Sequence, residues 1–252
     1  MSMYAVLGTT GNTGQCLLEV LLQNPGTKVN AYCRSKEKLL DQSSAAIKDG
    51  TIRIFEGSLG DIDLLTECLR GTRAAFLVVA GTGNMSGCCI ARETAQHALT
   101  AVKRLKVQDE PLPKLILLSS ASLDHALMPN APRFLLKILW AAFSNRYEDI
   151  RQAEDLFRAQ HDLVSSTFVR PGALSHDTQK GHWLSTKVAK GPLSYMDLAA
   201  GMIEIAQDDR FDMKAVAVNP RDKNVAFPWQ APMMLIKGLI VHFLPWTYYY
   251  LQ

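Results

Sequence analysis

The chain has 252 residues, of which 48% are hydrophobic, and this length fits one large domain or one domain with a small appendage. Its net charge of +3 and its lack of a dense Lys/Arg block argue against a nucleic-acid partner. Five cysteines without repeated spacing indicate neither a disulfide framework nor a zinc site, so we expect a reducing, cytoplasmic compartment.

Apolar runs of strand length alternate with longer segments of helical periodicity through most of the chain. The predicted strands are Tyr4–Leu7, Val29–Cys33, Ile52–Phe55, Ala74–Val79, Leu115–Leu118 and Thr167–Val169. The predicted helices are Gln15–Gln23, Ser35–Leu40, Asp61–Leu69, Ile90–Leu105 and Tyr147–Ala159. Continuously apolar strands such as AAFLVVA are typical of a parallel sheet covered on both faces.

This alternation predicts an α/β fold, a doubly wound Rossmann-type parallel sheet with helices on both faces. We expect a single domain over residues 1–252, in which residues 1–171 form the Rossmann core. After Pro171 the alternation weakens, so residues 172–252 are expected to form a smaller C-terminal substrate-binding or lid portion above the sheet.

The stretch GTTGNTG, between the first predicted strand and the first predicted helix, is a candidate dinucleotide-binding turn. Its glycines are spaced G-x-x-G-x-x-G, one residue longer in the first interval than the usual G-x-G-x-x-G. The first glycine permits a tight turn, the second lets the backbone approach a pyrophosphate, and the third lets the helix pack closely. A purely structural turn is the alternative. The residues that we expect at the phosphates are Gly8, Thr10, Gly11, Asn12, Thr13 and Gly14.

The end of the second predicted strand indicates which dinucleotide binds. An NAD site usually has an acidic residue about 20 positions after the glycines, whereas an arginine there accommodates the 2′-phosphate of NADP. Arg34 lies at this position and is followed by Ser35 and Lys36. A guanidinium is a planar, bidentate partner for phosphate. We therefore predict NADP(H), with an ordinary exposed turn as the alternative.

Five segments, TTGNTG, RSKEKL, GSLGD, LLSSAS and TFVRPGAL, resemble the short-chain dehydrogenase/reductases, and more narrowly their atypical, NmrA-like branch. YMDLAAGMI is similar to an aspartate-led helix start of that branch, and the C-terminal LIKGLIVHFLPWTYYYL is similar to fungal averufin-oxidase-like oxidoreductases of polyketide pathways. The resemblance implies a nicotinamide cofactor, and an activity among reductases, isomerases or redox sensors without catalysis. The further cofactor contacts that it implies are Ser58, Leu59, Ala80, Gly81 and Ser119.

The resemblance also implies catalytic residues. Ser120 matches the family serine that holds a substrate oxygen, and Tyr147 matches the acid/base tyrosine. The residue four positions after Tyr147 is Arg151 and not the family lysine, so it can hold the cofactor ribose but cannot relay protons. Tyr147 as a helix-surface aromatic remains the alternative, with the proton supplied by Ser120, His125 or solvent.

The leading hypothesis is an NADP(H)-dependent oxidoreductase for a small carbonyl, enone or aromatic compound. Its rival is a regulator that senses NADP status and binds a protein partner. His176 and His182 are candidates for the wall of the substrate pocket, and with Asp177 they lack the ordered third ligand of a metal site, so no metal is expected.

The last 21 residues are expected to form a pocket lid or the face of a homodimer, or simply to cover apolar surface. Between Pro232 and Pro245 only 12 residues are free to be helical, fewer than the roughly 20 that a membrane span needs. No membrane span is therefore predicted.

Overall fold

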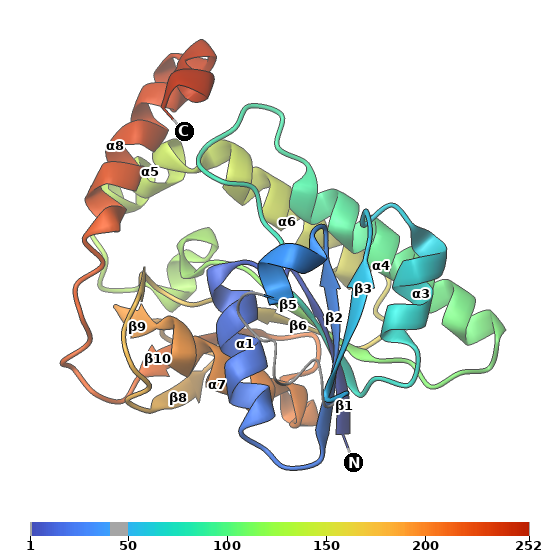
Figure 1. The fold of residues 1–252 in the computed structure, drawn as a ribbon. Coiled ribbons are helices and arrows are strands. Elements are labelled where there is room, and N and C mark those ends of the chain that lie inside the picture. Colours follow the sequence, from blue (N-terminus) through green and yellow to red (C-terminus); the bar gives the residue numbers. More distant parts are fainter. Residues whose placement is uncertain (1, 41–49, 252) are drawn as a thin grey trace.

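A computed structural model describes residues 2–40 and 50–251. Its strands are β1 (Ser2–Leu7), β2 (Thr27–Cys33), β3 (Ile52–Glu56), β4 (Ala74–Leu77), β5 (Lys114–Leu118), β6 (Ser166–Val169), β7 (Leu174–Ser175), β8 (His182–Ser185), β9 (Leu193–Ser194) and β10 (Ala215–Pro220). Within the described residues, eight of them form one sheet in the order β3-β2-β1-β4-β5-β6-β10-β8 (Figure 1), while β7 pairs with β9.

The sheet is parallel from β3 through β10, and only β8 runs antiparallel to its neighbour. The predicted doubly wound sheet is therefore confirmed. The central strand β1 pairs with β2 on one side and with β4 on the other. The chain reverses its direction of travel across the sheet at this point, so the crevice that binds ligands in such folds opens at the carboxyl ends of β1 and β4.

Helices cover both faces of the sheet (Figure 1). They are α1 (Asn12–Leu22), α3 (Ile62–Leu69), α4 (Ile90–Val107), α5 (Arg133–Ala142), α6 (Ser144–Ala159), α7 (Tyr195–Ala206) and α8 (Gln230–Phe243), with short 3-10 helices η1 (Ala121–Leu123), η2 (His125–Leu127), η3 (Asp209–Phe211) and η4 (Pro245–Tyr250). Tyr4 and Val6 of β1 pack in the layer of α1 and α7, whereas Ala5 and Leu7 pack in the layer of α3, α4 and α6. Both faces of β1 are buried, which explains why the strand is continuously apolar.

All six predicted strands are present, and four of the five predicted helices correspond to α1, α3, α4 and α6. The fifth, Ser35–Leu40, is also confirmed, because residues 36–40 are helical. The expectation for residues 172–252 needs one correction. This portion does not lie wholly above the sheet, since it contributes β8 and β10 to the sheet and α7 to one of its covering layers.

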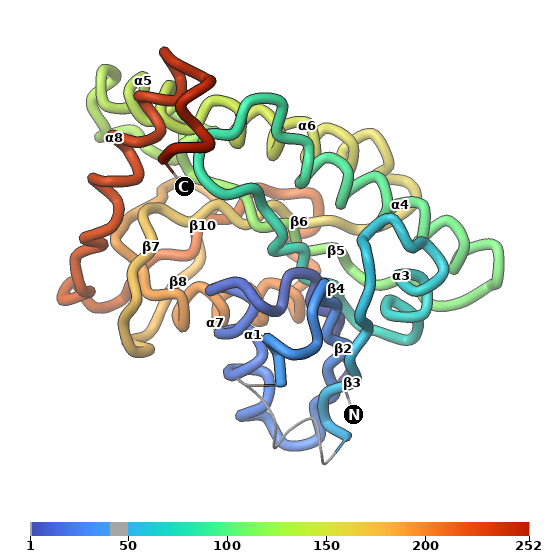
Figure 2. Tube along the Cα trace, turned by 45° about the horizontal axis from the view of Figure 1, so that its top comes forward, coloured from blue at the N-terminus to red at the C-terminus, as the bar shows by residue number. Residues whose placement is uncertain are grey.

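The rest of the C-terminal portion, α8 with η4, packs beside α5 and away from the sheet (Figure 2). α8 begins two residues before Pro232, because a proline in the first helical turn removes no internal hydrogen bond. Gly238 makes the crossing with α5 possible, since a Cβ there would collide with the carbonyl group of Ala142. In residues 2–40 and 50–251, every helix is too short or too polar to cross a membrane.

Candidate functional site

The glycine-rich turn joins β1 to α1 at the carboxyl edge of the sheet. Gly8 has a φ of +97°, which side-chain-bearing residues rarely adopt, and its carbonyl oxygen accepts a hydrogen bond from the Gly11 N–H at 3.1 Å. A Cβ on Gly14 would collide with the same oxygen and lie 2.7 Å from the Cα of Thr9. Gly11, by contrast, is exposed, and a Cβ there would lie 3.5 Å from its nearest neighbour. Gly8 and Gly14 therefore shape the turn, and Gly11 leaves its outer side open.

The first turn of α1 presents backbone amides without partners in the helix. Gly11 is the N-cap, no side chain caps the helix, and the first turn has no acidic residue. The N–H groups of Asn12 and Thr13 consequently carry the partial positive charge of a helix N-terminus. Thr10 lies beside them, and its carbonyl oxygen accepts a hydrogen bond from Gln15 Nε2 at 3.0 Å. This arrangement suits an anionic group such as a pyrophosphate.

The carboxyl ends of β2 and β3 lie side by side next to this turn. Arg34, directly after β2, is exposed and forms no ion pair with another described residue, and Ser35 beside it is half-buried. The nearest carboxylate on the neighbouring strand is Glu56, whose Oε1 accepts a hydrogen bond from the Lys36 N–H at 2.9 Å. A guanidinium without an ion-pair partner among the described residues thus lies at the position that the sequence assigned to the 2′-phosphate.

Ser58 and Leu59 follow β3 at the same edge. The Tyr32 hydroxyl donates a hydrogen bond to the Ser58 carbonyl oxygen at 2.7 Å, and burial of the ring raises the pKa of Tyr32 to about 12, which keeps the phenol protonated as a donor. Ser58 Oγ accepts a hydrogen bond from the Gly60 N–H at 3.3 Å. The Ser58 side chain is exposed, and Leu59 packs partly into the core.

The loop between β4 and α4 begins with Ala80 and Gly81. Gly81 is buried, and a Cβ there would lie 2.6 Å from Cys88 Sγ. Cys88 Sγ donates a hydrogen bond to Asp149, whose buried carboxylate also accepts from the Ala91 N–H at 2.8 Å. Asp149 of α6 therefore caps the N-terminus of α4 and holds the end of this loop in place. Sequence reasoning missed it because nothing near residue 149 marks a cap for a helix that begins at residue 90.

The two serines after β5 have different surroundings. Ser119 is buried, and its hydroxyl donates a hydrogen bond to Glu154 Oε1 at 2.6 Å. Glu154 also forms a buried ion pair with Arg170 at 2.5 Å. The Ser119 hydroxyl is therefore committed to the core, which corrects the expectation that it serves the cofactor. Ser120 is half-buried, and its oxygen accepts from the Ser122 N–H at 3.3 Å, so its proton is free for an external acceptor.

The expected pairing of Tyr147 with Arg151 is absent. Tyr147 is buried, and its ring packs against the rings of Trp140 and Phe143, each with centroids 5.7 Å away. The Arg151 guanidinium is half exposed and bonds to Glu148 at 2.7 Å and Asp155 at 3.1 Å. Those two carboxylates lie along the outer surface of α6 and draw the guanidinium away from Tyr147. The expectation that Arg151 holds the cofactor ribose therefore needs correction, and Tyr147 is not a helix-surface aromatic.

The three candidate histidines lie apart. His125 is exposed in η2. His176 lies at the glycine-rich turn, with Nε2 3.4 Å from the side-chain nitrogen of Asn12 and its ring against that of Tyr195. His182 lies on β8 and contacts Glu204 of α7 at 2.8 Å, at the far edge of the sheet. His176 thus borders the site, whereas His182 does not line it.

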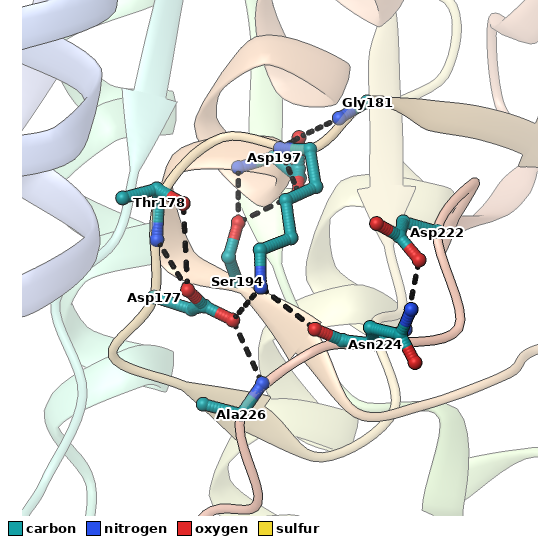
Figure 3. A network of polar contacts seen from close by, with 9 residues as sticks. Asp177, Thr178, Gly181, Ser194, Asp197, Asp222, Asn224 and Ala226 are labelled. Carbon is teal, nitrogen blue, oxygen red and sulfur yellow. Dashed lines mark hydrogen bonds and ion pairs between the residues drawn. The ribbon is translucent and has the colours of Figure 1, made fainter.

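Residues after β6 are tied to the chain that precedes α8 (Figure 3). The Asp177 carboxylate accepts hydrogen bonds from Lys180 Nζ and from the Ala226 N–H, each at 2.7 Å. These hydrogen bonds lower the pKa of Asp177 to about 2, and the one from Lys180 has the largest effect. Asp197 of α7 accepts in turn from the Gly181 N–H at 2.8 Å. In the described part of the chain no three His, Cys, Asp or Glu side chains gather as a metal site.

The C-terminal segment closes over the β4–α4 loop. Tyr248 donates a hydrogen bond from its hydroxyl to the Thr82 carbonyl oxygen at 3.2 Å. A pocket of about 340 Å³ lies between the loop and this segment. Its lining residues are Thr82, Gly83, Asn84, Met234, Lys237, Gly238, Val241, Tyr248 and Leu251. Met234 and Tyr248, among these lining residues, both belong to the C-terminal segment.

Comparisons with known proteins agree with this geometry. The model of the NAD(P)H-binding family matches residues 8–209. The oxidoreductase aflX of Aspergillus parasiticus is 48% identical over 253 residues, which cover 99% of this chain and 95% of that protein. The oxidoreductase ordB of Dothistroma septosporum is 46% identical over 256 residues, with the same coverage. A short-chain dehydrogenase/reductase structure from Veillonella parvula has a TM-score of 0.67 at 16% identity and covers 89% of this chain and 96% of its own, a likeness of fold.

Proposed function

The chain belongs to the NAD(P)H-binding family, and on that premise we propose that it is an NADP(H)-dependent oxidoreductase for a small, apolar carbonyl, enone or aromatic compound. Relatives of 48% and 46% identity that are named oxidoreductases support the reaction class. The resemblance of the C-terminal stretch to oxidoreductases of fungal polyketide pathways supports an aromatic, polyketide-derived substrate. The free cysteines support a cytoplasmic location.

The glycine-rich turn fits the pyrophosphate of a dinucleotide. Two of its glycines are required by the backbone, and the third leaves an open side where a side chain would stand in the way of a ligand. The open amides of Asn12 and Thr13 supply donors for phosphate oxygens. These residues fit the cofactor without rearrangement, and the exposed Ser58 would lie toward its adenosine half.

The observation that carries the choice of NADP(H) is the guanidinium of Arg34, which forms no ion pair with another described residue. The carboxylate of Glu56, on the neighbouring strand, accepts a hydrogen bond from the Lys36 N–H. Bidentate hydrogen bonds between a guanidinium and a phosphate are among the strong ones in proteins. NADPH offers this phosphate and NADH does not.

When bound, the reduced nicotinamide supplies a hydride. Ser120 is the residue of this chain that we assign to the substrate, because its hydroxyl proton is free while its oxygen is fixed by the Ser122 N–H. It would donate a hydrogen bond to the substrate oxygen and stabilise the charge that develops there. Tyr147 keeps its place as a candidate proton donor, since its hydroxyl forms no hydrogen bond with another described residue.

The pocket beneath α8 is the site that we assign to the apolar part of the substrate. Met234, Val241, Tyr248 and Leu251 supply an apolar wall, and the volume of about 340 Å³ is within the range of small-molecule sites. The Thr82 end of the pocket belongs to the same loop as Ala80 and Gly81, which places it next to the expected path of the cofactor.

Turnover tests the proposal. The purified protein should oxidise NADPH when it is offered a panel of aromatic quinones, enones and aldehydes, and it should do so more slowly with NADH. Ser120→Ala should lower the rate for every active substrate. Tight binding of NADPH without oxidation across the panel would instead support a regulator that senses NADP status, and no binding of either nucleotide would reject both functions.

A further inference from the structure

The exposed hydrophobic side chains of this protein are concentrated in one region. Of the sixteen large hydrophobic residues that stand exposed among those described, all but Val107 lie in residues 133–142 or 227–251, which we term the apolar lobe (Figure 2). The exposed members are Phe134, Leu135, Ile138, Trp140, Phe227, Trp229, Met233, Met234, Ile236, Ile240, Phe243, Leu244, Trp246, Tyr249 and Tyr250. Scattered exposed hydrophobic residues are ordinary, whereas a contiguous group of this size marks an interaction surface.

The apolar lobe is fixed to the body of the protein. Asn84, buried on the β4–α4 loop, donates hydrogen bonds to the carbonyl oxygens of Ala141 at 3.2 Å and Gly238 at 3.3 Å and accepts one from the Asn145 N–H at 2.9 Å. His242 of α8 contacts Ser144 Oγ at 3.0 Å. Because these bonds hold α5 and α8 in one orientation, the exposed side chains form a preformed surface and not a loose tail.

The charge of this region differs from that of the rest of the chain. No aspartate or glutamate occurs in residues 125–147 or 223–252, whereas these stretches contain five cations, at Arg133, Lys137, Arg146, Lys223 and Lys237. Since the whole chain carries +3, the remainder carries −2. None of the five cations forms an ion pair with another described residue.

The aromatic composition is equally uneven. Three of the four tryptophans of the chain, Trp140, Trp229 and Trp246, lie in the apolar lobe, and Trp229 is 82% exposed. Tyr249 and Tyr250 are 80% and 81% exposed. Tryptophan and tyrosine are enriched at membrane–water interfaces, where an apolar ring and a polar group are satisfied together.

A second copy of the chain is a poor match for this surface. A twofold dimer brings the same patch of both subunits together, so Arg133 and Lys137 of both subunits would meet without any carboxylate of the lobe to pair with. An anionic lipid surface matches both properties, because its headgroups attract the cations and its acyl boundary accepts the aromatic and aliphatic side chains. α5 and α8, with 10 and 14 residues, are too short to span and suit a position in the plane of the interface.

We propose that the apolar lobe docks this protein on the surface of a bilayer that contains anionic lipids. The proposal is independent of the reaction that the protein catalyses. The proposal agrees with the prediction that the C-terminal segment is not a membrane span. It assigns the exposed side of that segment to lipid. The inner side of the segment lines the pocket at Met234 and Lys237.

Co-sedimentation of the full chain with vesicles tests this proposal. The protein should bind vesicles of phosphatidylcholine mixed with phosphatidylserine, bind phosphatidylcholine alone about tenfold more weakly, and lose affinity as salt is added. A variant with Trp229→Ser, Phe243→Ser and Trp246→Ser should bind the mixed vesicles at least about tenfold more weakly. Its matched control is Val107→Ser, which removes the exposed hydrophobic side chain outside the lobe and should bind as the wild type does.

Charge is tested in the same assay. Arg133→Glu with Lys137→Glu should weaken binding by about tenfold or more, whereas Lys103→Glu with Lys106→Glu, on α4, should change it little. Unchanged thermal melting and NADPH binding show that each variant is folded. A wild-type protein that stays in the supernatant with mixed vesicles would overturn the proposal. Binding of the triple variant equal to that of the wild type would also overturn it, as would light scattering that shows a dimer which the triple variant dissolves.

Discussion

Alanine at Gly14 and at Gly11 should have different consequences, although the two substitutions are chemically the same. A Cβ at Gly14 would collide with the Gly8 carbonyl oxygen and lie 2.7 Å from Thr9 Cα, so the backbone of the turn has to move. Overpacking of this kind costs about 1–3 kcal/mol. In a chain of this size each kcal/mol lowers the melting temperature by roughly 2–4 °C, so Gly14→Ala should melt roughly 2–12 °C lower. Its NADPH affinity should fall as well, since the displaced turn carries the phosphate donors.

Gly11→Ala is the matched control. The φ of −85° and ψ of 165° at Gly11 suit any residue, and the added Cβ would lie at an ordinary distance of 3.5 Å from its nearest neighbour. Its stability should therefore stay within about 1 kcal/mol of the wild type, because the smaller unfolded-state entropy of alanine opposes its poorer fit at the N-cap position. Its NADPH affinity should nevertheless fall by about tenfold or more, because the methyl group occupies the side where the pyrophosphate approaches.

Thermal melting with a reporter dye and titration of intrinsic fluorescence with NADPH measure both quantities on the same samples. Full NADPH affinity in Gly11→Ala would refute the assignment of this glycine to the pyrophosphate. A Gly14→Ala variant as stable as the wild type would show that the turn relaxes without cost, which contradicts the geometry given above.

Three further predictions concern the residues around the site. Glu154→Ala should lower the free energy of unfolding by about 1.5–3 kcal/mol in a denaturant titration, because the buried guanidinium of Arg170 loses its hydrogen bonds to Glu154 and keeps only its ion pair with Asp124. A loss below about 1 kcal/mol would argue against the buried pair. Ser120→Ala should lower kcat by at least about tenfold with an unchanged Kd for NADPH. Arg151→Ala should change neither quantity, and a large loss of NADPH affinity in this variant would return Arg151 to the cofactor site. Burial raises the pKa of Cys16 to about 11, so the folded protein favours the neutral thiol. The stability that results is present below pH 9 and is lost as the pH rises toward 11. Maleimide should therefore label Cys16 more slowly in the folded protein at pH 8 than after unfolding.

The fold followed from the sequence because its signals are local. Continuous apolar strands and periodic helices identified the six parallel strands that build the core, and the glycine spacing identified the turn between β1 and α1. β10 was not predicted, although its apolar run AVAV is as long as β4 and β6, because the alternation of strands and helices weakens after Pro171. α5 was not predicted either, although RFLLKILWAA has the periodicity of an amphipathic helix.

The candidate site was less predictable, because its details depend on partners far apart in the chain. The role of Ser119 is decided by Glu154 and Arg170, and that of Arg151 by carboxylates on its own helix. Asn84 and Asp149 organise the β4–α4 loop through contacts across 57 to 154 residues of sequence, and no local motif announces them.

The relative affinity of the protein for NADPH and NADH, measured for the wild type and for Arg34→Glu, tests the central claim most directly. Lys28→Glu, which makes the same charge change near the other end of β2, is the control. We predict that Arg34→Glu weakens NADPH binding by at least about tenfold, equivalent to about 1.4 kcal/mol, while NADH binding changes little and Lys28→Glu resembles the wild type. An equal loss for both nucleotides, or a wild type that does not prefer NADPH, would contradict the assignment of Arg34 to the 2′-phosphate.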